Sequence, residues 1–348
     1  MNIIIDAMGG DHAPQAVVAG CKMALEAMDI TLTLVGREKQ IRREMELCGL
    51  KDDRIQIIHA EEVIFGEDDP MTAIRRKKDS SMRIALSLLK EGKGDVVVSG
   101  GNTGALISGA TLLVKRIPGV RRVALAPVMP ALNGCFLLLD AGANVECTPA
   151  FLKQFAIMGA IYMEKVMKRK APSVGLVNIG SEEEKGTPLV QKTHALLKEI
   201  PVNYQGYIEA RDIPLGGADV VVCDGFTGNV ILKCMEGMGS AFAGMLKNIF
   251  MKNLATKAAA GIVKGGLENL KKSMDYTEYG GAPILGVAKP VIKAHGSSNA
   301  KAFYHAIRQA CLVVENKVTD AMAEHIADYS EEILQNDERM EEACTQTS

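Results

Sequence analysis

The feature that most constrains this chain is a strand–turn–helix pattern that occurs twice. Residues 219–229 are DVVVCDGFTGN and residues 95–105 are DVVVSGGNTGA, so Asp, three Val, Gly, Thr and Gly recur at the same offsets. Three β-branched residues in a row suit a parallel strand buried on both faces. The glycine turn then leads into a helix start, whose unpaired N–H groups can bind an anion. Two such units predict a doubly wound α/β fold in which both turns face a common cleft.

The rest of the chain alternates apolar runs with amphipathic segments, which is the pattern of a mainly parallel sheet. Strands are expected at 3–5, 31–36, 54–60, 173–180 and 202–210, and helices at 14–28, 70–90, 103–114, 149–168 and 299–317. The helix at 70–90 is expected to break near Asp79. Asn133-Gly134 separates the apolar runs 123–130 and 135–142 and favours a hairpin, so we expect an antiparallel pair within an otherwise parallel sheet.

Composition narrows the class of protein. The net charge of −2 argues against wholesale nucleic-acid binding. The eight cysteines are scattered without a CxxC pair or a Cys/His cluster, which indicates reduced thiols rather than a disulfide or zinc framework. The first residues enter a strand directly, and no run of about 18 apolar residues is present. We therefore expect a cytoplasmic protein that is at most peripherally attached to a membrane.

Two glycine turns are candidate phosphate sites. The turn after the first strand, DAMGGDHAP, contains Gly9 and Gly10 and follows the backbone logic of a phosphate cradle without a known fingerprint spacing; a plain tight turn explains it equally well. The turn GGNTGA supplies Asn102, Thr103 and Gly104 at a helix start, which suits phosphate oxygens. The alternative is that Thr103 only caps the helix.

Three further segments carry candidate ligands. Asp140 ends an apolar strand and is followed by Asn144, which places both at a cleft position unless the carboxylate only caps its own turn. Lys185, in the polar loop 181–188, is either a cationic contact or a surface lysine. His295 and Ser297 precede a helix and can hold an anion, with Ser298 expected as the N-cap of that helix.

The segment after the second glycine turn is expected to form two long helices, at 227–252 and 255–274. Between Gly244 and Lys272 it holds six lysines and one acid, interleaved with apolar residues that include Phe250, Leu254 and Ile262. A basic amphipathic helix pair can lie on an anionic membrane or pack against its twin in a dimer. An ordinary surface hairpin with a solvated lysine face is the alternative.

Taken together, the motifs DAMGGD, GGNTGA, LLLDAGAN, LVNIGSEEEKG, DVVVCDGFTGNVILK, GGAPILGV and HGSS resemble the phosphate acyltransferase (PlsX) family of bacterial phospholipid synthesis. The resemblance implies transfer of a long fatty acyl group from acyl carrier protein to inorganic phosphate. It also implies a three-layer α/β/α sandwich with a mainly parallel mixed sheet, similar to isocitrate and isopropylmalate dehydrogenases, with a protruding helical hairpin. A homodimer, peripheral membrane association and a downstream membrane glycerol-3-phosphate acyltransferase are further implications.

The same resemblance suggests how the chain is organised. Residues 1–320 are expected to form one α/β catalytic domain with two lobes around a cleft. Within it, residues 230–275 would form the amphipathic hairpin for dimer or membrane contact, and residues 321–348 a C-terminal helix and acidic tail. The chain departs from the family pattern at four positions: Gly100 replaces Ala, Thr187 replaces Asn, and Tyr207 and Ala210 replace Asn and Gly.

The chemistry needs neither a cofactor nor a metal, because a thioester is already electrophilic and phosphate is already a nucleophile at cell pH. The site must align the two and stabilise the developing oxyanion. We expect Lys185 and Asn229 to stabilise the oxyanion and Asp224 to orient them. Asn102, Thr103 and Gly104 would bind phosphate together with His295 and Ser297.

Basic runs and competing activities complete the predictions. Residues 75–78 and Arg121-Arg122 are candidates for docking the acidic carrier protein. The nearest alternative activity is a short-chain phosphotransacetylase that uses acyl coenzyme A. A dehydrogenase on this fold would need metal-binding carboxylates and a nucleotide site, neither of which is recognisable in the sequence. A membrane scaffold would explain the lysine-rich helices but not the glycine turns.

Overall fold

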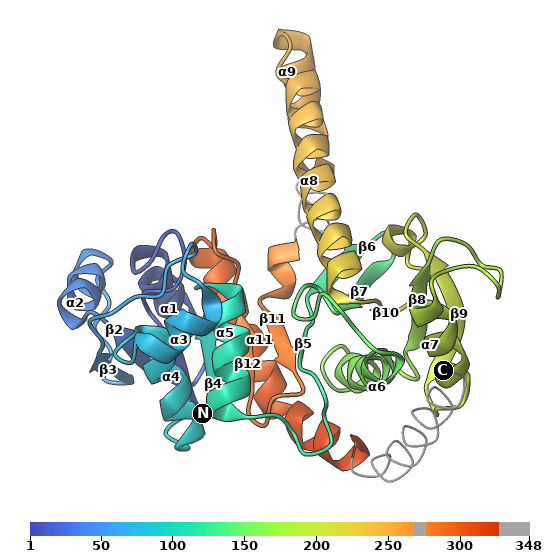
Figure 1. Ribbon diagram of the computed structural model, residues 1–348. Coiled ribbons are helices and arrows are strands. Elements are labelled where there is room, and N and C mark those ends of the chain that lie inside the picture. The colour runs from blue at the N-terminus through green and yellow to red at the C-terminus, as the bar shows by residue number, and fades with distance from the viewer. Residues whose placement is uncertain (268–275, 327–348) are drawn as a thin grey trace.

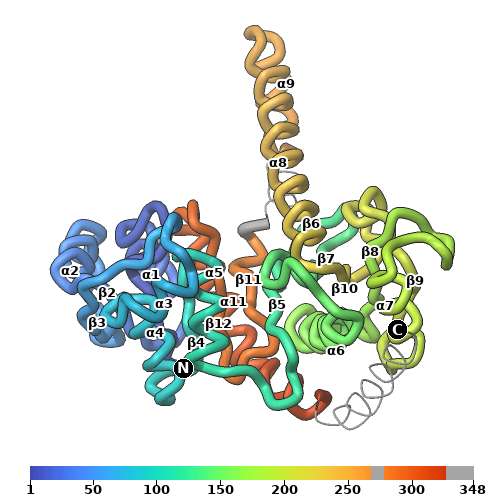
Figure 2. Tube along the Cα trace, viewed as in Figure 1, coloured from blue at the N-terminus to red at the C-terminus, as the bar shows by residue number. Residues whose placement is uncertain are grey.

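The computed structural model describes residues 1–267 and 276–326, and its strands form two sheets rather than the one expected. The first sheet has the order β3-β2-β1-β4-β12-β11-β5, with β1 Asn2–Asp6, β2 Thr31–Gly36, β3 Ile55–His59, β4 Val96–Ser99, β5 Ala124–Leu125, β11 Ala282–Leu285 and β12 Val291–Lys293. The second has the order β6-β7-β10-β8-β9, with β6 Val128–Ala131, β7 Gly134–Leu139, β8 Ser173–Asn178, β9 Asn203–Glu209 and β10 Val220–Val222. Each sheet, with its helices, forms one lobe (Figures 1 and 2).

The repeated valine strands occupy central positions, one in each sheet. β4 lies between β1 and β12, and β10 lies between β7 and β8, in parallel pairs. All six valines of the two strands are fully buried, as expected for strands covered on both faces. The interpretation of the repeat as two related strand–turn–helix units is therefore confirmed, although the units lie in different sheets.

One apolar run, residues 123–130, contributes a strand to each of the two sheets. Residues 123–130 were expected to be a single strand, but β5 pairs with β11 of the first sheet and β6 pairs with β7 of the second. The chain crosses between lobes at Ala126 and Pro127. The hairpin at Asn133-Gly134 is confirmed as the antiparallel pair β6–β7. β11 is a second antiparallel element that the sequence did not indicate, since it runs against both β12 and β5.

Helices cover both faces of the sheets, which confirms the layered α/β arrangement. Their bounds are α1 Gln15–Ala27, α2 Glu38–Leu47, α3 Pro70–Arg76, α4 Ser81–Lys90, α5 Thr103–Gly109, α6 Pro149–Lys165, α7 Pro188–Lys198, α8 Gly225–Phe250, α9 Leu254–Ile262 and α11 Ala300–Glu315. Ile3 and Ile5 pack on the α1 and α11 side, whereas Ile4 packs on the α3 to α5 side, as the alternation of a strand requires. The expected break near Asp79 separates α3 from α4, and α5 continues into a π-helical turn at Ala110–Val114.

Helices α8 and α9 form an arm that projects from the body of the molecule (Figure 1). Asp224 and Asn253 accept hydrogen bonds from backbone N–H groups at the starts of α8 and α9. α9 ends at Ile262, earlier than the expected 274, and residues 268–275 of the expected helix lie outside the described residues. The chain is again helical at 318–326, and the predicted acidic tail from 327 onward also lies outside them. Within the described ranges, no helix has both the length and the apolar character to cross a bilayer.

Candidate active site

A cavity of about 980 Å³ lies between the two lobes. The first lobe contributes the turn after β1, the loop before α3, the turn between β4 and α5, and the turn after β12. The second lobe contributes the turn after β7 and the first turns of α8. Because most of these segments follow the carboxyl ends of parallel strands, the cavity occupies the position where open α/β sheets bind ligands.

Seven of the predicted site residues are brought together at this cavity. Those that line it are Gly10, Asn102, Thr103, Gly104, Asn229, His295 and Ser297. Gly9 lies just behind them, and a Cβ atom at that position would be 2.6 Å from the backbone nitrogen of Gly101. A Cβ atom on Gly100 would likewise be 2.8 Å from the carbonyl oxygen of Gly9. These two glycines let the turns after β1 and β4 approach each other closely.

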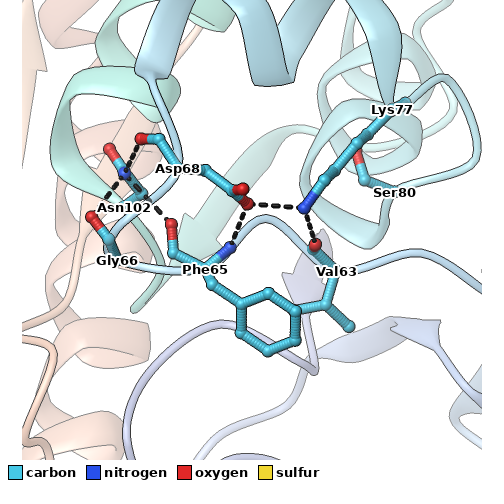
Figure 3. Close-up of polar contacts among 7 residues, drawn as sticks. All are labelled: Val63, Phe65, Gly66, Asp68, Lys77, Ser80 and Asn102. Carbon is cyan, nitrogen blue, oxygen red and sulfur yellow. Dashed lines mark hydrogen bonds and ion pairs between the residues drawn. The ribbon is translucent and has the colours of Figure 1, made fainter.

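The side chain of Asn102 is used to hold the cavity wall in place. Its amide nitrogen donates to the carbonyl oxygens of Phe65, Gly66 and Asp68 at 3.0–3.1 Å (Figure 3). Its oxygen accepts from the backbone nitrogen of Ala105 as the N-cap of α5. Asn102, not Thr103, is thus the capping residue. Its contact with a ligand in the cavity would have to come at the expense of these bonds.

The loop that Asn102 holds is also fastened from its other side. The ammonium of Lys77 donates to the carbonyl oxygen of Val63 at 2.9 Å and to the carboxylate of Asp68 at 2.5 Å, and that carboxylate accepts the N–H of Phe65 (Figure 3). The hydrogen bond from Lys77 lowers the pKa of Asp68. Val63, Ile64 and Phe65 of this loop line the cavity and form an apolar wall. The aromatic ring of Phe65 remains half exposed.

His295 of the first lobe and Glu236 of α8 approach each other at the cavity. The Nδ1 atom of His295 lies 2.8 Å from the hydroxyl of Ser297 and accepts the N–H of Ser297, while Nε2 lies 3.9 Å from a carboxylate oxygen of Glu236. Burial lowers the pKa of His295. Glu236 also accepts from the ammonium of Lys233 at 2.7 Å. The N-cap of the following helix is Asn299, not Ser298.

Asp140 and Asn144 do not line the cavity. The carboxylate of Asp140 is fully buried and accepts from the backbone nitrogens of Leu125, Ala143 and Asn144. Burial raises its pKa. The Asn144 amide donates both to that carboxylate and to the carbonyl oxygen of Val123. The geometry is that of a carboxylate that caps its own turn, and this turn in turn presents Ala141 and Gly142 to the cavity.

Two of the predicted catalytic residues also lie away from the cavity lining. Asp224 is the N-cap of α8, where it accepts from the backbone nitrogen and the hydroxyl of Thr227. Lys185 lies on the exposed loop before α7 and pairs with Glu182 at 2.7 Å. That hydrogen bond raises the pKa of Lys185. Only Asn229 of the predicted catalytic group lines the cavity itself.

Sequence reasoning missed two lysines that do line the cavity, Lys233 and Lys293. Each had a local signal. Lys233 lies one helical turn after Asn229 and therefore on the same face of α8. Lys293 is a charged residue at the end of the apolar strand β12, and burying a cation costs free energy unless it is paired or hydrogen-bonded. With His295 they place three nitrogen-bearing side chains in the same cavity as the apolar residues of the loop before α3, which suits an anion attached to, or next to, an apolar chain.

The three predicted membrane residues lie on the arm. Leu254 and Ile262 are 85% and 87% exposed, whereas Phe250 is only partly exposed. The arm exposes further apolar side chains, including those of Met238, Met245 and Ile249.

Comparison with known proteins gives consistent matches over nearly the whole chain. The family model described as fatty acid synthesis protein matches residues 1–321. A phosphate acyltransferase of Alkaliphilus oremlandii is 52% identical over 94% of this chain and 98% of its own length. A phosphate acyltransferase of Thermoanaerobacter pseudethanolicus is 49% identical over 96% of this chain and 99% of its own length.

Solved structures show the same fold at low identity. A phosphotransacetylase from Streptococcus pyogenes has a TM-score of 0.62 at 16% identity and covers 92% of this chain and 94% of its own. A branched-chain phosphotransacylase from Enterococcus faecalis has a TM-score of 0.57 at 16% identity, and the match covers 90% of this chain and 99% of that protein's chain. The more specific likeness to isocitrate and isopropylmalate dehydrogenases stays a prediction.

Proposed function

The chain belongs to the phosphate acyltransferase family, and from this premise we propose that it transfers a long-chain fatty acyl group from acyl carrier protein to inorganic phosphate. The product, acyl phosphate, would serve phospholipid synthesis. Family membership supports the general reaction, acyl transfer to phosphate by an acyltransferase. The proposal goes beyond this general reaction in two respects: the acyl donor is bound to acyl carrier protein, and the acyl chain is long.

One observation carries the proposal, namely that nitrogen-bearing side chains and an apolar loop line the same cavity. Lys233, Lys293 and the His295 turn line the cavity together with the apolar residues Val63, Ile64 and Phe65. A phosphate oxygen can attack the thioester carbonyl carbon when both are held there; the carbon–sulfur bond then breaks and the carrier thiolate leaves and takes up a proton. Alignment and oxyanion stabilisation are the contributions that such a site makes.

The proposed catalytic roles differ in how well the geometry supports them. Asn229 lines the cavity from the second turn of α8, so its amide can donate to the developing oxyanion. Asp224 acts through the cap that orients this turn. Lys185 does not line the cavity, so its role in oxyanion stabilisation requires the loop before α7 to move toward the cavity.

A carrier protein with an acidic surface would dock beside the loop at 63–69. Arg75, Arg76 and Lys78 are exposed at the end of α3, and α3 packs against α5, which begins at the cavity. Lys77 is not part of this surface, because it is engaged with Asp68 and Val63. Arg121-Arg122 remain the second candidate for the same contact.

The arm of α8 and α9 is the proposed site of peripheral membrane contact and of homodimer contact. Its exposed apolar side chains and its lysines match the composition of helices that lie on anionic membranes. Contact with a membrane would deliver acyl phosphate to a membrane glycerol-3-phosphate acyltransferase, the proposed downstream partner.

The test is acyl phosphate formation by the purified protein from palmitoyl carrier protein and phosphate, with palmitoyl and acetyl coenzyme A assayed in parallel. Turnover with the carrier-bound long chain is the expected result. Turnover with acetyl coenzyme A alone would instead identify a short-chain phosphotransacetylase. Absence of acyl phosphate with every donor would reject the acyltransferase proposal.

A further inference from the structure

The most unusual charged group at the cavity is Lys293, the last residue of β12. Its side chain is 7% exposed, and it lines the cavity. β12 runs parallel to β4 with Lys293 opposite Ser99, so the lysine lies next to the glycine turn that follows β4. Burying a lysine costs free energy unless its ammonium is paired with an anion or fully hydrogen-bonded.

The hydrogen bonds of Lys293 within the described part of the protein leave one N–H donor of its ammonium for a further acceptor. The Nζ atom donates to the carbonyl oxygen of Gly100 at 3.1 Å and to that of Ala294. An ammonium has three donors. Among the described residues, these two carbonyls are the hydrogen-bond acceptors of Lys293, so the third donor can serve a ligand in the cavity.

Charged groups face Lys293 from several elements. Asp6 of β1 and Asp11 of the following turn attract its charge, while Lys233 of α8 repels it and His295 lies two residues further on. The Asp6 carboxylate already accepts from the hydroxyls of Ser81 and Ser99. Burial is the largest effect, and it lowers the pKa of Lys293 to about 8.

We propose that Lys293 is the buried cation that binds the phosphate substrate, between the Gly100 turn and the His295 turn. This inference rests on the proposed function, since it names a residue that acts in the same site. Two lysines from different lobes, Lys293 and Lys233, would then hold phosphate from two sides, with the hydroxyl of Ser297 as a further donor. A charge-assisted hydrogen bond to phosphate is about twice as strong as a neutral one.

The proposal predicts that phosphate binding is coupled to proton uptake. In the free protein Lys293 is mostly neutral above pH 8. A dianion in contact with it favours the charged form, so binding raises the pKa of Lys293 and draws a proton from solvent. Phosphate is itself already mostly dianionic above about pH 8 and contributes little uptake. Below about pH 7 Lys293 is already charged, and the uptake from it disappears.

The experiment is calorimetric titration of the full chain with inorganic phosphate at about pH 8.5, in two buffers with different ionisation enthalpies. The wild-type chain should take up more than about half a proton. Lys293→Met should bind phosphate roughly 10- to 100-fold more weakly and without uptake. Lys293→Arg should keep binding but lose the uptake, because a guanidinium does not titrate in this range.

Lys289→Met is the matched control. Lys289 precedes the same strand and also donates to two backbone carbonyls, those of Leu89 and Lys90, but it does not line the cavity. It should keep both the affinity and the uptake of the wild type. Circular dichroism and thermal unfolding of each variant separate loss of fold from loss of phosphate binding.

Two results would overturn the inference. One is wild-type affinity and uptake in Lys293→Met, and the other is phosphate binding by the wild type without any proton uptake at about pH 8.5. The proposed function fails in a different way, namely when the wild-type chain neither binds phosphate nor forms acyl phosphate. The two failures can therefore be told apart.

Discussion

Gly228 lies so close to the carbonyl oxygen of Asp140 that a Cβ atom at position 228 would be 1.9 Å from that oxygen. The glycine belongs to the first turn of α8, and Asp140 ends the strand next to β10. The backbone nitrogen of Gly225 also donates to the carbonyl oxygen of Asn144 at 2.7 Å. The start of α8, which carries Asn229 and Lys233 into the cavity, is thus positioned by direct backbone contact with the Asp140 turn.

Gly228→Ala should therefore destabilise the protein by about 3 kcal/mol, because a backbone oxygen cannot move aside as a side chain can. Urea unfolding measures this change. Gly237→Ala is the control in the same helix, since nothing lies within 4 Å of a Cβ atom there, and it should be neutral or stabilising by up to about 1 kcal/mol. Equal stabilities of the two variants would show that the close contact is not maintained in solution.

Asn102→Asp should loosen the loop at 63–69 while preserving the cap of α5. The carboxylate can still accept from Ala105, but it loses the donors to the carbonyl oxygens of Phe65, Gly66 and Asp68. Faster hydrogen exchange in this loop and a KM for the acyl donor about tenfold higher are expected. Asn299→Asp, the same substitution at the N-cap of α11, should leave loop exchange unchanged. Unaltered exchange in the Asn102 variant would refute the fastening role.

Asn229→Ala should lower kcat by about 100-fold with the fold intact, because an oxyanion donor contributes mainly in the transition state. Lys185→Met should lower kcat as well if its loop closes during turnover. Lys192→Met, an exposed lysine on the helix after that loop, is the control for Lys185. Normal steady-state turnover in either catalytic variant would remove that residue from the proposed mechanism.

Reversing the charges of Arg75 and Arg76 to Glu should weaken binding of the acyl carrier protein while leaving turnover of palmitoyl coenzyme A unchanged. Both side chains are exposed at the C-terminal end of α3. Reversal of Lys39 and Arg43, on the exposed side of α2, is the matched control. Carrier affinity is measured by titration at low ionic strength, where the effect of surface charges is largest. An affinity equal to that of the control would place carrier docking elsewhere.

Leu254→Glu should reduce binding to anionic liposomes by about tenfold or more, since it places a carboxylate where an apolar side chain would enter the membrane. Leu47→Glu is the control. Leu47 is 70% exposed, similar to the 85% of Leu254, but it lies at the end of α2 and not on the arm. Flotation of the protein with vesicles measures the partition. Unchanged flotation of Leu254→Glu would count against the arm as the membrane contact.

Much of the candidate site could be located from the sequence because the turns are local signals. The paired valine runs, the glycine turns and the break near Asp79 all depend on residues within a few positions of one another, and the structure confirms them. The contacts that each side chain of these turns makes were harder to predict from the sequence. Asn102 looked like a ligand, but its amide holds Phe65, which is 37 positions away in the chain.

The repeated strand–turn–helix units could be predicted from the amino-acid sequence, since β-branched runs, glycine turns and helix starts follow from short-range sterics and backbone hydrogen bonding. The tertiary structure was needed to show that these units belong to two sheets, that Asp140 caps its own turn, and that Lys293 and Lys233 line the same cavity. The physical reason is that the burial and pairing of a side chain depend on atoms contributed by distant segments. For Lys293 those atoms come from the Gly100 turn, 193 positions earlier in the chain.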